Sequence, residues 1–158
     1  MTINPERRLF LRGGAPLPIR PPWALPEDPF LARCNRCNNC LSTCPQHILV
    51  TDRLGYPMVD FSKAACTFCG ACVRHCDGRA LVVMDGIPPW RHKARFAETC
   101  LNSRSIPCRT CGEQCVSHAI LFPPSPGGRS LPTLIPEQCN GCGACVGVCP
   151  VTAIRLVN

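Results

Sequence analysis

Residues 139–150 read CNGCGACVGVCP, and this stretch decides how the rest of the chain is interpreted. It places thiols at Cys139, Cys142, Cys145 and Cys149, directly before Pro150. The spacing C-x2-C-x2-C-x3-C-P is typical of bacterial iron–sulfur proteins, in which three closely spaced thiolates bind one cluster and the fourth binds another. Proline has a fixed φ and no N–H, so it turns the chain away from the site. The stretch therefore predicts an iron–sulfur site.

Three further groups of four cysteines precede this one, and we number the groups sets one to four in chain order. The last cysteines of successive sets are 32, 39 and 34 residues apart, which indicates an internal repeat. Set three has seven residues between its first two cysteines, where the other sets have two, so its loop is expected to be looser. Asp77 and Val116 stand where proline follows the other sets. The three sets are Cys34, Cys37, Cys40 and Cys44; Cys66, Cys69, Cys72 and Cys76; and Cys100, Cys108, Cys111 and Cys115.

The composition indicates that bound metal replaces much of a conventional core. The 158 residues include 16 cysteines and 18 prolines, and only 6% are aromatic. Small domains with thin cores need disulfides or metals. We expect no export signal and no membrane-spanning segment, so reduced thiols that hold metal are favoured over disulfides. Zinc is the alternative, but zinc sites pair CxxC units across longer gaps than these.

The formal net charge of +7 does not predict a nucleic-acid partner. Four [4Fe–4S] clusters with their thiolates would carry roughly eight negative charges, which offset that excess. Because every set has four cysteines, no iron is left open for a substrate. We therefore expect clusters that carry electrons and no enzyme activity.

The fold class predicted is α+β, with two tandem units that resemble bacterial two-cluster ferredoxins. The expected divisions are a proline-rich arm at residues 1–30, a first unit at 31–88, a helical connector at 89–99 and a second unit at 100–158. Short strands are expected at 47–52, 56–61, 80–84, 119–122, 131–135 and 153–157. Asn38, Gly70 and Gly143 follow the second cysteine of sets one, two and four, and we expect a left-handed backbone there. Set three lacks an equivalent.

The resemblance to two-cluster ferredoxins implies that sets one and two pair, that sets three and four pair, and that the fourth cysteines cross over. A pairing of set one with four and of two with three remains open. His47 and His118 lie three residues after the last cysteine of sets one and three, and we interpret them as capping or packing residues first. The crossover groups are Cys34, Cys37, Cys40 and Cys76; Cys66, Cys69, Cys72 and Cys44; Cys100, Cys108, Cys111 and Cys149; and Cys139, Cys142, Cys145 and Cys115.

The arm allows two interpretations. It begins with a twin-arginine-like motif, but glycines and prolines at 13–18 follow where an export signal has an apolar region. The arm is therefore either a solvated tail or a segment that docks onto a partner. Its candidate partner-binding residues are Arg7, Arg8, Arg20 and Trp23.

The arginine pair, the motif RPPW at residues 20–23 and the long-gap third set together resemble the NapF family, the ferredoxin-type accessory proteins of the periplasmic nitrate reductase system. This resemblance implies a cytoplasmic protein that contacts the immature molybdenum-containing catalytic subunit, NapA, before export. It also implies a role in maturing that subunit, by electron transfer or by iron–sulfur cluster assembly. A soluble polyferredoxin that carries electrons to an oxidoreductase is the alternative function, and a zinc-stabilised interaction module is the third.

Overall fold

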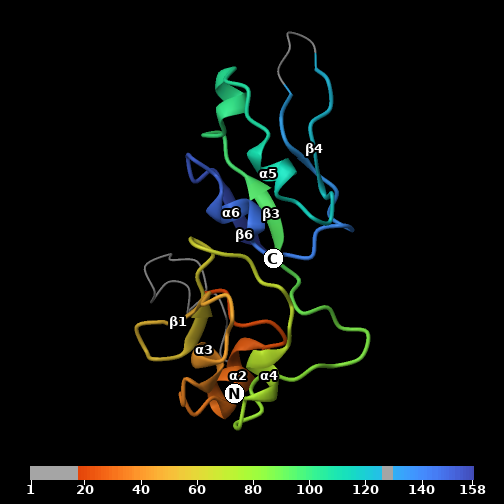
Figure 1. Ribbon diagram of the computed structural model, residues 1–158. Helices are drawn as coiled ribbons and strands as arrows, with labels where there is room; N and C mark the ends of the chain where they lie inside the picture. Colours follow the sequence, from red (N-terminus) through yellow and green to blue (C-terminus); the bar gives the residue numbers. More distant parts are fainter. Residues whose placement is uncertain (1–17, 126–129) are drawn as a thin grey trace, which may run out of the picture.

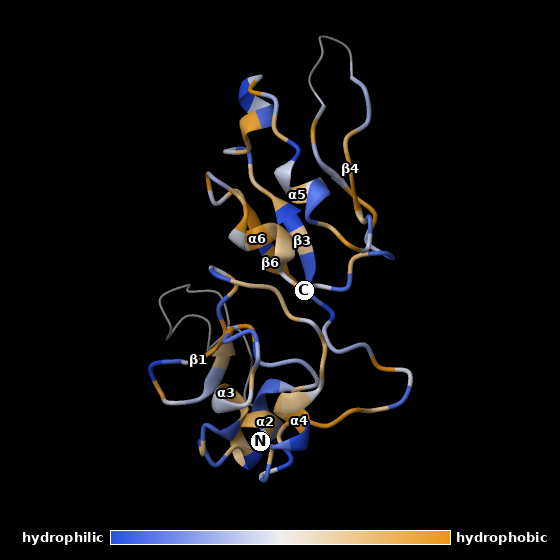
Figure 2. Cartoon of the chain, viewed as in Figure 1, coloured by the Kyte–Doolittle hydropathy of each residue, from blue (hydrophilic) through white to orange (hydrophobic). Residues whose placement is uncertain are grey.

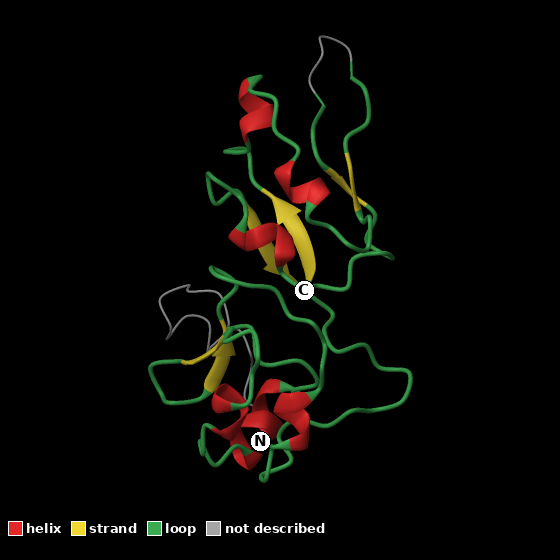
Figure 3. Cartoon of the chain, in the orientation of Figure 1, coloured by secondary structure: helices red, strands yellow, loops and turns green. Residues whose placement is uncertain are grey.

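The computed structural model describes residues 18–125 and 130–158. These residues form an N-terminal half, residues 18–92, and a C-terminal half, residues 93–158, placed end to end (Figure 1). Helices and strands are short, and loops make up much of both halves (Figure 3). The arrangement is the predicted α+β class with two tandem ferredoxin-like units.

The N-terminal half contains three helices and one β-hairpin among its described residues. The hairpin pairs Leu49 with Val59 in antiparallel register, which confirms the two strands expected around it. Its turn is held by Asp52, whose Oδ1 accepts the backbone N–H groups of Leu54 and Tyr56, both at 2.9 Å. The elements are α2 (Glu27–Arg33), α3 (Asn39–Ser42), β1 (Leu49–Thr51), β2 (Pro57–Val59) and α4 (Ala71–Arg74).

The prediction of a strand at residues 80–84 is wrong, because Leu81 makes only an isolated β-bridge to Ala24. The partner is the arm, whose Trp23 carbonyl accepts the Val82 N–H at 2.9 Å. Prolines on both sides of this arm segment have no N–H to donate, so the ladder cannot extend. The chain beyond this bridge projects as a loop with hydrophobic residues along part of it (Figure 2).

The C-terminal half contains two small sheets and three short helical segments among its described residues. Strand β3 pairs with β6 in antiparallel register, with Lys93 opposite Val157 and Phe96 opposite Ile154. Strand β4 pairs with β5, with Ile120 opposite Leu134. The elements are β3 (Lys93–Phe96), the 3-10 helix η1 (Leu101–Arg104), α5 (Thr110–Glu113), β4 (Ile120–Leu121), β5 (Thr133–Leu134), α6 (Ala144–Gly147) and β6 (Ile154–Val157).

The prediction of a helical connector at 89–99 is wrong, since this segment contains β3. The strand buries Ala94 and leaves Arg95 exposed, the alternation expected of a half-buried strand. The partner strand, β6, lies about sixty residues further along the chain, so no local sequence pattern predicts the pairing.

The arm from residue 18 onward is part of the N-terminal half. Arg20 is 8% exposed, and its guanidinium pairs with Glu27 at 2.8 Å and Asp52 at 2.9 Å. The indole N–H of Trp90 donates to the Arg20 carbonyl at 3.0 Å, and the ring of Trp23 packs edge-on against Phe68. Arg20 thus makes internal contacts. The interpretation of the arm as a solvated tail is wrong for residues 18–30. Arg7 and Arg8 lie outside the described residues.

Helix α2 was not expected within the arm, although its signals are present. Pro26 precedes it, and Glu27 and Asp28 occupy its first turn, where acidic groups are favourable. Phe30 anchors the helix in the larger of the two hydrophobic clusters of the described residues, together with Ile48 and Leu81. The second cluster is small and centres on Ala94, Ile120, Cys145 and Ile154.

No helix within residues 18–125 and 130–158 is both long enough and apolar enough to cross a bilayer.

Candidate metal centres

Four cavities in the described part of the chain are each lined by four cysteines. The empty space at each, open solvent at its mouth included, is similar, between about 300 and 350 Å³, and the cavity that includes the long-gap third set is as large as the others. We name them sites A to D. Site A is lined by Cys34, Cys37, Cys40 and Cys76; site B by Cys44, Cys66, Cys69 and Cys72; site C by Cys100, Cys108, Cys111 and Cys149; and site D by Cys115, Cys139, Cys142 and Cys145.

These groups agree with a crossover of the fourth cysteine within pairs one–two and three–four. Cys76 of set two lies at site A, and Cys44 of set one lies at site B. The same exchange places Cys149 at site C and Cys115 at site D. Pairing set one with four would require other groups, so the geometry decides between the two arrangements left open by the sequence.

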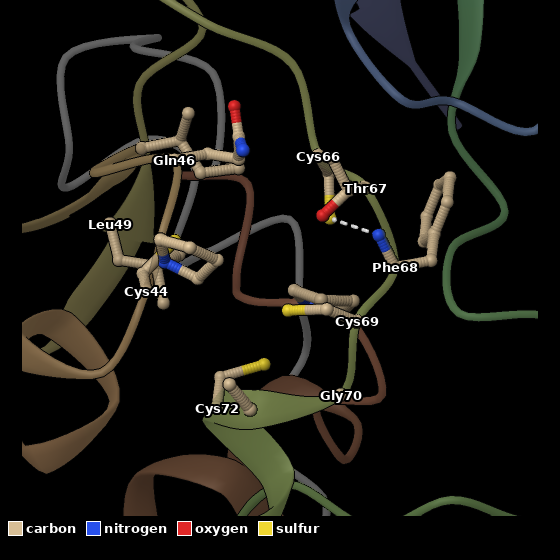
Figure 4. A pocket seen from close by; sticks show the side chains of 13 residues that line it. Cys44, Gln46, Leu49, Cys66, Thr67, Phe68, Cys69, Gly70 and Cys72 are labelled. Atoms are coloured by element: carbon tan, nitrogen blue, oxygen red, sulfur yellow. Dashed lines mark hydrogen bonds between the residues drawn. The ribbon is translucent and has the colours of Figure 1, made fainter.

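A left-handed residue begins the short helix at three of the sites, as predicted. Asn38, Gly70 and Gly143 have φ of 63°, 72° and 83°, and they precede α3, α4 and α6. Each helix then buries the third cysteine of its set, at Cys40, Cys72 and Cys145. Figure 4 shows the result at site B, where Cys66 and Cys69 from the loop and Cys72 from α4 line the same cavity.

Site C lacks the left-handed residue, but an asparagine side chain accepts the N–H of its second cysteine, as Asn35 and Asn140 do at sites A and D, at 3.3 and 3.1 Å. Arg109, after the second cysteine of set three, has φ of −129°. Asn102, from η1 in the long gap, accepts the Cys108 N–H at 3.0 Å and donates to the Cys108 carbonyl at 2.6 Å. The side chain is 6% exposed. Sequence reasoning missed this residue, although an amide in the gap before the second cysteine was available as a signal.

A second backbone feature, also missed, follows the last cysteine of every set. The residue three positions later has a positive φ in all four cases: His47 at 51°, Arg79 at 49°, His118 at 51° and Thr152 at 48°. Its N–H donates to the carbonyl of that last cysteine, at 2.9 to 3.1 Å. The shared feature is the turn, so the two histidines act here through their backbone, in line with a structural interpretation.

The turns direct amide N–H groups toward sulfur. Ala119 and Ala153 donate to Sγ of Cys115 and Cys149, at 3.3 and 3.2 Å. At site B the Phe68 N–H donates to Cys66 Sγ at 3.3 Å (Figure 4). Such hydrogen bonds stabilise negative charge on sulfur and are among the features that set the potential of an iron–sulfur cluster.

Burial beside one another raises the pKa of several of these thiols and makes them difficult to ionise. Burial, followed by the neighbouring Cys34, Cys37 and Cys76, raises the pKa of Cys40 to about 11. The same causes raise the pKa of Cys72 and Cys145 to about 12. Iron binds thiolate, so binding of a cluster requires these thiols to lose their protons.

The donor atoms fit a [4Fe–4S] cluster at each site. All sixteen cysteines lie in the described residues, where none forms a disulfide. The four sulfurs of a site surround a cavity, and no three candidate ligands in the described residues are grouped as a single ion would require. Four thiolates around one cavity are the ligands that bind a cubane cluster. Such a cluster would supply one-electron redox chemistry there.

Comparison with known proteins agrees with this geometry. Two family models, each described as a 4Fe-4S dicluster domain, match residues 33–81 and 104–153. The ferredoxin-type protein NapF of Escherichia coli strain K12 is 39% identical over 157 residues, which cover 98% of this chain and 95% of that protein. The chain belongs to the NapF family of ferredoxin-type proteins.

The NapF of Haemophilus influenzae is 42% identical, over 99% of this chain and 96% of its own length. The methylamine utilization ferredoxin-type protein MauM of Methylorubrum extorquens is 34% identical, over 88% of this chain and 72% of its own length. Membership of the NapF family, with two dicluster domains, makes this chain an iron–sulfur protein of the electron-transfer type.

Removing the iron is expected to unfold the C-terminal half before the N-terminal half. The C-terminal half has the smaller hydrophobic cluster, so metal binding supplies more of its stability. Circular dichroism and limited proteolysis during anaerobic chelation would test this, with cleavage expected first in residues 93–158. Equal resistance of both halves after complete loss of iron would contradict it.

Proposed function

We propose that sites A to D each hold one [4Fe–4S] cluster, four in all, through the sixteen cysteines named above. The observation that supports this proposal is that all sixteen cysteines fall into four groups of four, each around a cavity of similar size. Anaerobic reconstitution followed by iron and sulfide analysis tests this, and roughly sixteen irons per chain are expected. A stoichiometry near eight would overturn the number.

We further propose that the protein acts in the cytoplasm on the immature catalytic subunit of a periplasmic nitrate reductase and helps to mature it before export. The proposal is supported by 39–42% identity to NapF proteins over nearly the whole chain. Electron transfer to the subunit, or help with assembly of its own cluster, is the contribution expected of a four-cluster protein. Arg7 and Arg8 are the proposed partner contacts. Arg20 and Trp23 would contribute by holding the segment after these two arginines against the N-terminal half.

The structure sharpens the test of partner binding. Deleting residues 1–30 would remove Arg20 and the first four of the seven residues of α2, including the buried Phe30, and would damage the fold. Deleting residues 1–17 keeps every contact described above. We expect this shorter deletion to weaken capture of the signal-bearing catalytic subunit by about tenfold or more, the effect of losing an interface hot spot.

The pull-down needs two matched variants. Arg7→Ala combined with Arg8→Ala should reproduce most of the loss, whereas Arg104→Ala, an exposed arginine in η1, should bind like the wild type. Iron content should be equal in all samples. Unchanged capture by the 1–17 deletion, with its iron intact, would remove the arm from the proposal.

A general electron carrier is the second candidate function. It is favoured by the similarity to MauM, a ferredoxin-type protein named for methylamine utilization. A general carrier would reduce several unrelated acceptors at similar rates and would be indifferent to the 1–17 deletion. A maturation factor would show selective binding to the immature subunit that the deletion weakens.

A further inference from the structure

The two halves meet at sites B and D. The Cys66 N–H of site B donates to the Cys142 carbonyl of site D at 2.9 Å, a direct backbone link between ligands of different halves. Beside it, the ring of Phe61 lies directly against Gly143, with no room for a side chain at that glycine. A third contact brings Gly141 against the His92 carbonyl, where an added Cβ would lie at 2.6 Å.

A glycine in α6 indicates that this approach is built into the sequence. Gly147 lies two residues after the third cysteine of set four, where sets one, two and three have Ser42, Arg74 and Glu113. A Cβ at Gly147 would lie 2.6 Å from the Phe61 carbonyl oxygen and 3.3 Å from that of Ser62. These are backbone atoms that cannot rotate away, so the close contact requires glycine at this position of set four, where the other three sets carry a side chain.

Aromatic side chains fix the N-terminal side of the contact. Phe61 packs edge-on against Trp90 with ring centroids 5.7 Å apart, and Phe68 packs on the same Trp90 at 5.5 Å. Phe61 and Trp90 are buried, and Phe68 lines site B. This cluster holds Phe61 in a single position, which makes it a rigid platform for α6.

The neighbourhood of the thiols gives the order of the sites. Helix α3, which carries Cys40 of site A, packs against α4, which carries Cys72 of site B. In the same way α5, which carries Cys111 of site C, packs against α6, which carries Cys145 of site D. Between the halves, the hydrogen bond from Cys66 to Cys142 joins sites B and D. The order along the molecule is therefore A, B, D, C, which differs from the order of the sets in the chain.

We propose that Phe61, Gly143 and Gly147 are positioning residues that hold sites B and D together as the inner pair of this linear order, so that a single electron can cross between the halves here. The inference rests on the proposed four clusters. The step takes one electron from a reduced site and gives it to an oxidised one, with no bond made and no proton moved. Sites A and C are then the two ends, where a one-electron donor and an acceptor would exchange electrons with the protein.

The test replaces Gly147 by alanine. The residue lies in a helix and its φ is not in the left-handed range, so the substitution suits the helix and perturbs only the contact. Glu113→Ala is the matched control, because it changes the same position of α5, away from the junction. Gly147→Leu is a second variant that forces a larger separation.

Three measurements are made on each anaerobically reconstituted protein: iron content, hydrogen exchange of the Cys66 amide, and electron paramagnetic resonance after full reduction by dithionite. We expect equal iron in all proteins and magnetic coupling between reduced sites B and D in the wild type and Glu113→Ala. Gly147→Ala and Gly147→Leu should show faster exchange at Cys66 and loss of that coupling.

Coupling that persists in both Gly147 variants, or that is absent from a fully loaded wild type, would overturn the inference and leave the four clusters standing. A wild type that cannot be loaded beyond two clusters would instead count against the proposed function. Iron analysis therefore separates the two failures.

Discussion

Replacing Cys37 and Cys76 together is expected to cost no more iron than replacing either one alone. Cys76 belongs to set two in the sequence but lines site A with Cys37, so both substitutions damage the same site. Each alanine variant should lose one cluster, leaving roughly twelve of roughly sixteen irons, and the double variant should remain near that value. Effects of residues that act as one unit are not additive.

The matched comparison is Cys37→Ala with Cys44→Ala. These residues are closer in sequence, within set one, yet Cys44 lines site B. The pair should therefore lose two clusters and retain roughly eight irons. If instead the Cys37–Cys44 pair behaved as a unit and the Cys37–Cys76 pair were additive, the fourth cysteines would not cross over.

Replacing Arg20 by alanine is expected to destabilise the N-terminal half by about 3 kcal/mol, the lower end of the cost of breaking a buried ion pair, since its carboxylate partners keep some contact with water. The substitution leaves Glu27 and Asp52 without their shared cation and removes the donor to the Pro57 carbonyl. It also removes a guanidinium stacked 5.0 Å from the Phe30 ring centre. Denaturant unfolding of the loaded protein, under anaerobic conditions, measures the loss.

Arg36→Ala is the control for Arg20→Ala. Like Arg20, Arg36 has its guanidinium over an aromatic ring, here 5.2 Å from the centre of the Tyr56 ring. Because Arg36 is exposed, its replacement should lower the free energy of unfolding by less than about 0.5 kcal/mol. Similar effects of the two substitutions would show that the buried network contributes little.

The stability from the Arg20 pair should not change across neutral pH. Burial alone would raise the pKa of Asp52, but the Tyr56 N–H, the Arg20 guanidinium and the Leu54 N–H together hold that pKa below its ordinary value. A carboxyl with a lowered pKa contributes stability above its unfolded pKa and loses it as pH falls through the folded one. The difference between wild type and Arg20→Ala should thus be equal at about pH 6 and about pH 8.

The parts of the structure that the sequence predicted are those set by local spacing. Three closely spaced cysteines can surround one cavity only if the chain curls, and Asn38, Gly70 and Gly143 supply the left-handed residue that the curl needs. The β1–β2 hairpin was equally accessible, because Gly55 and Asp52 mark its turn. Site C shows the limit of such reasoning, because it lacks the left-handed residue and its Asn102 lies six residues before Cys108, whereas Asn35 and Asn140 lie two residues before the cysteines to which they bond.

The parts that were missed depend on partners distant in the chain. Residues 93–96 have no strong local preference and become a strand because β6 lies beside them. Arg20 resembles a surface arginine until Asp52, from the hairpin turn, reaches it. Tertiary contacts override local propensity at both places, and no motif encodes either contact.

The pairing of β3 with β6 has a consequence for how the protein is made. All eight thiols of sites A and B have been synthesised by residue 76, before β3 exists. Sites C and D wait for Cys149, and the sheet beside them closes only when residues 154–157 have emerged from the ribosome. The cysteines of sites A and B are therefore complete in the growing polypeptide 73 residues before those of sites C and D, because 149 − 76 = 73.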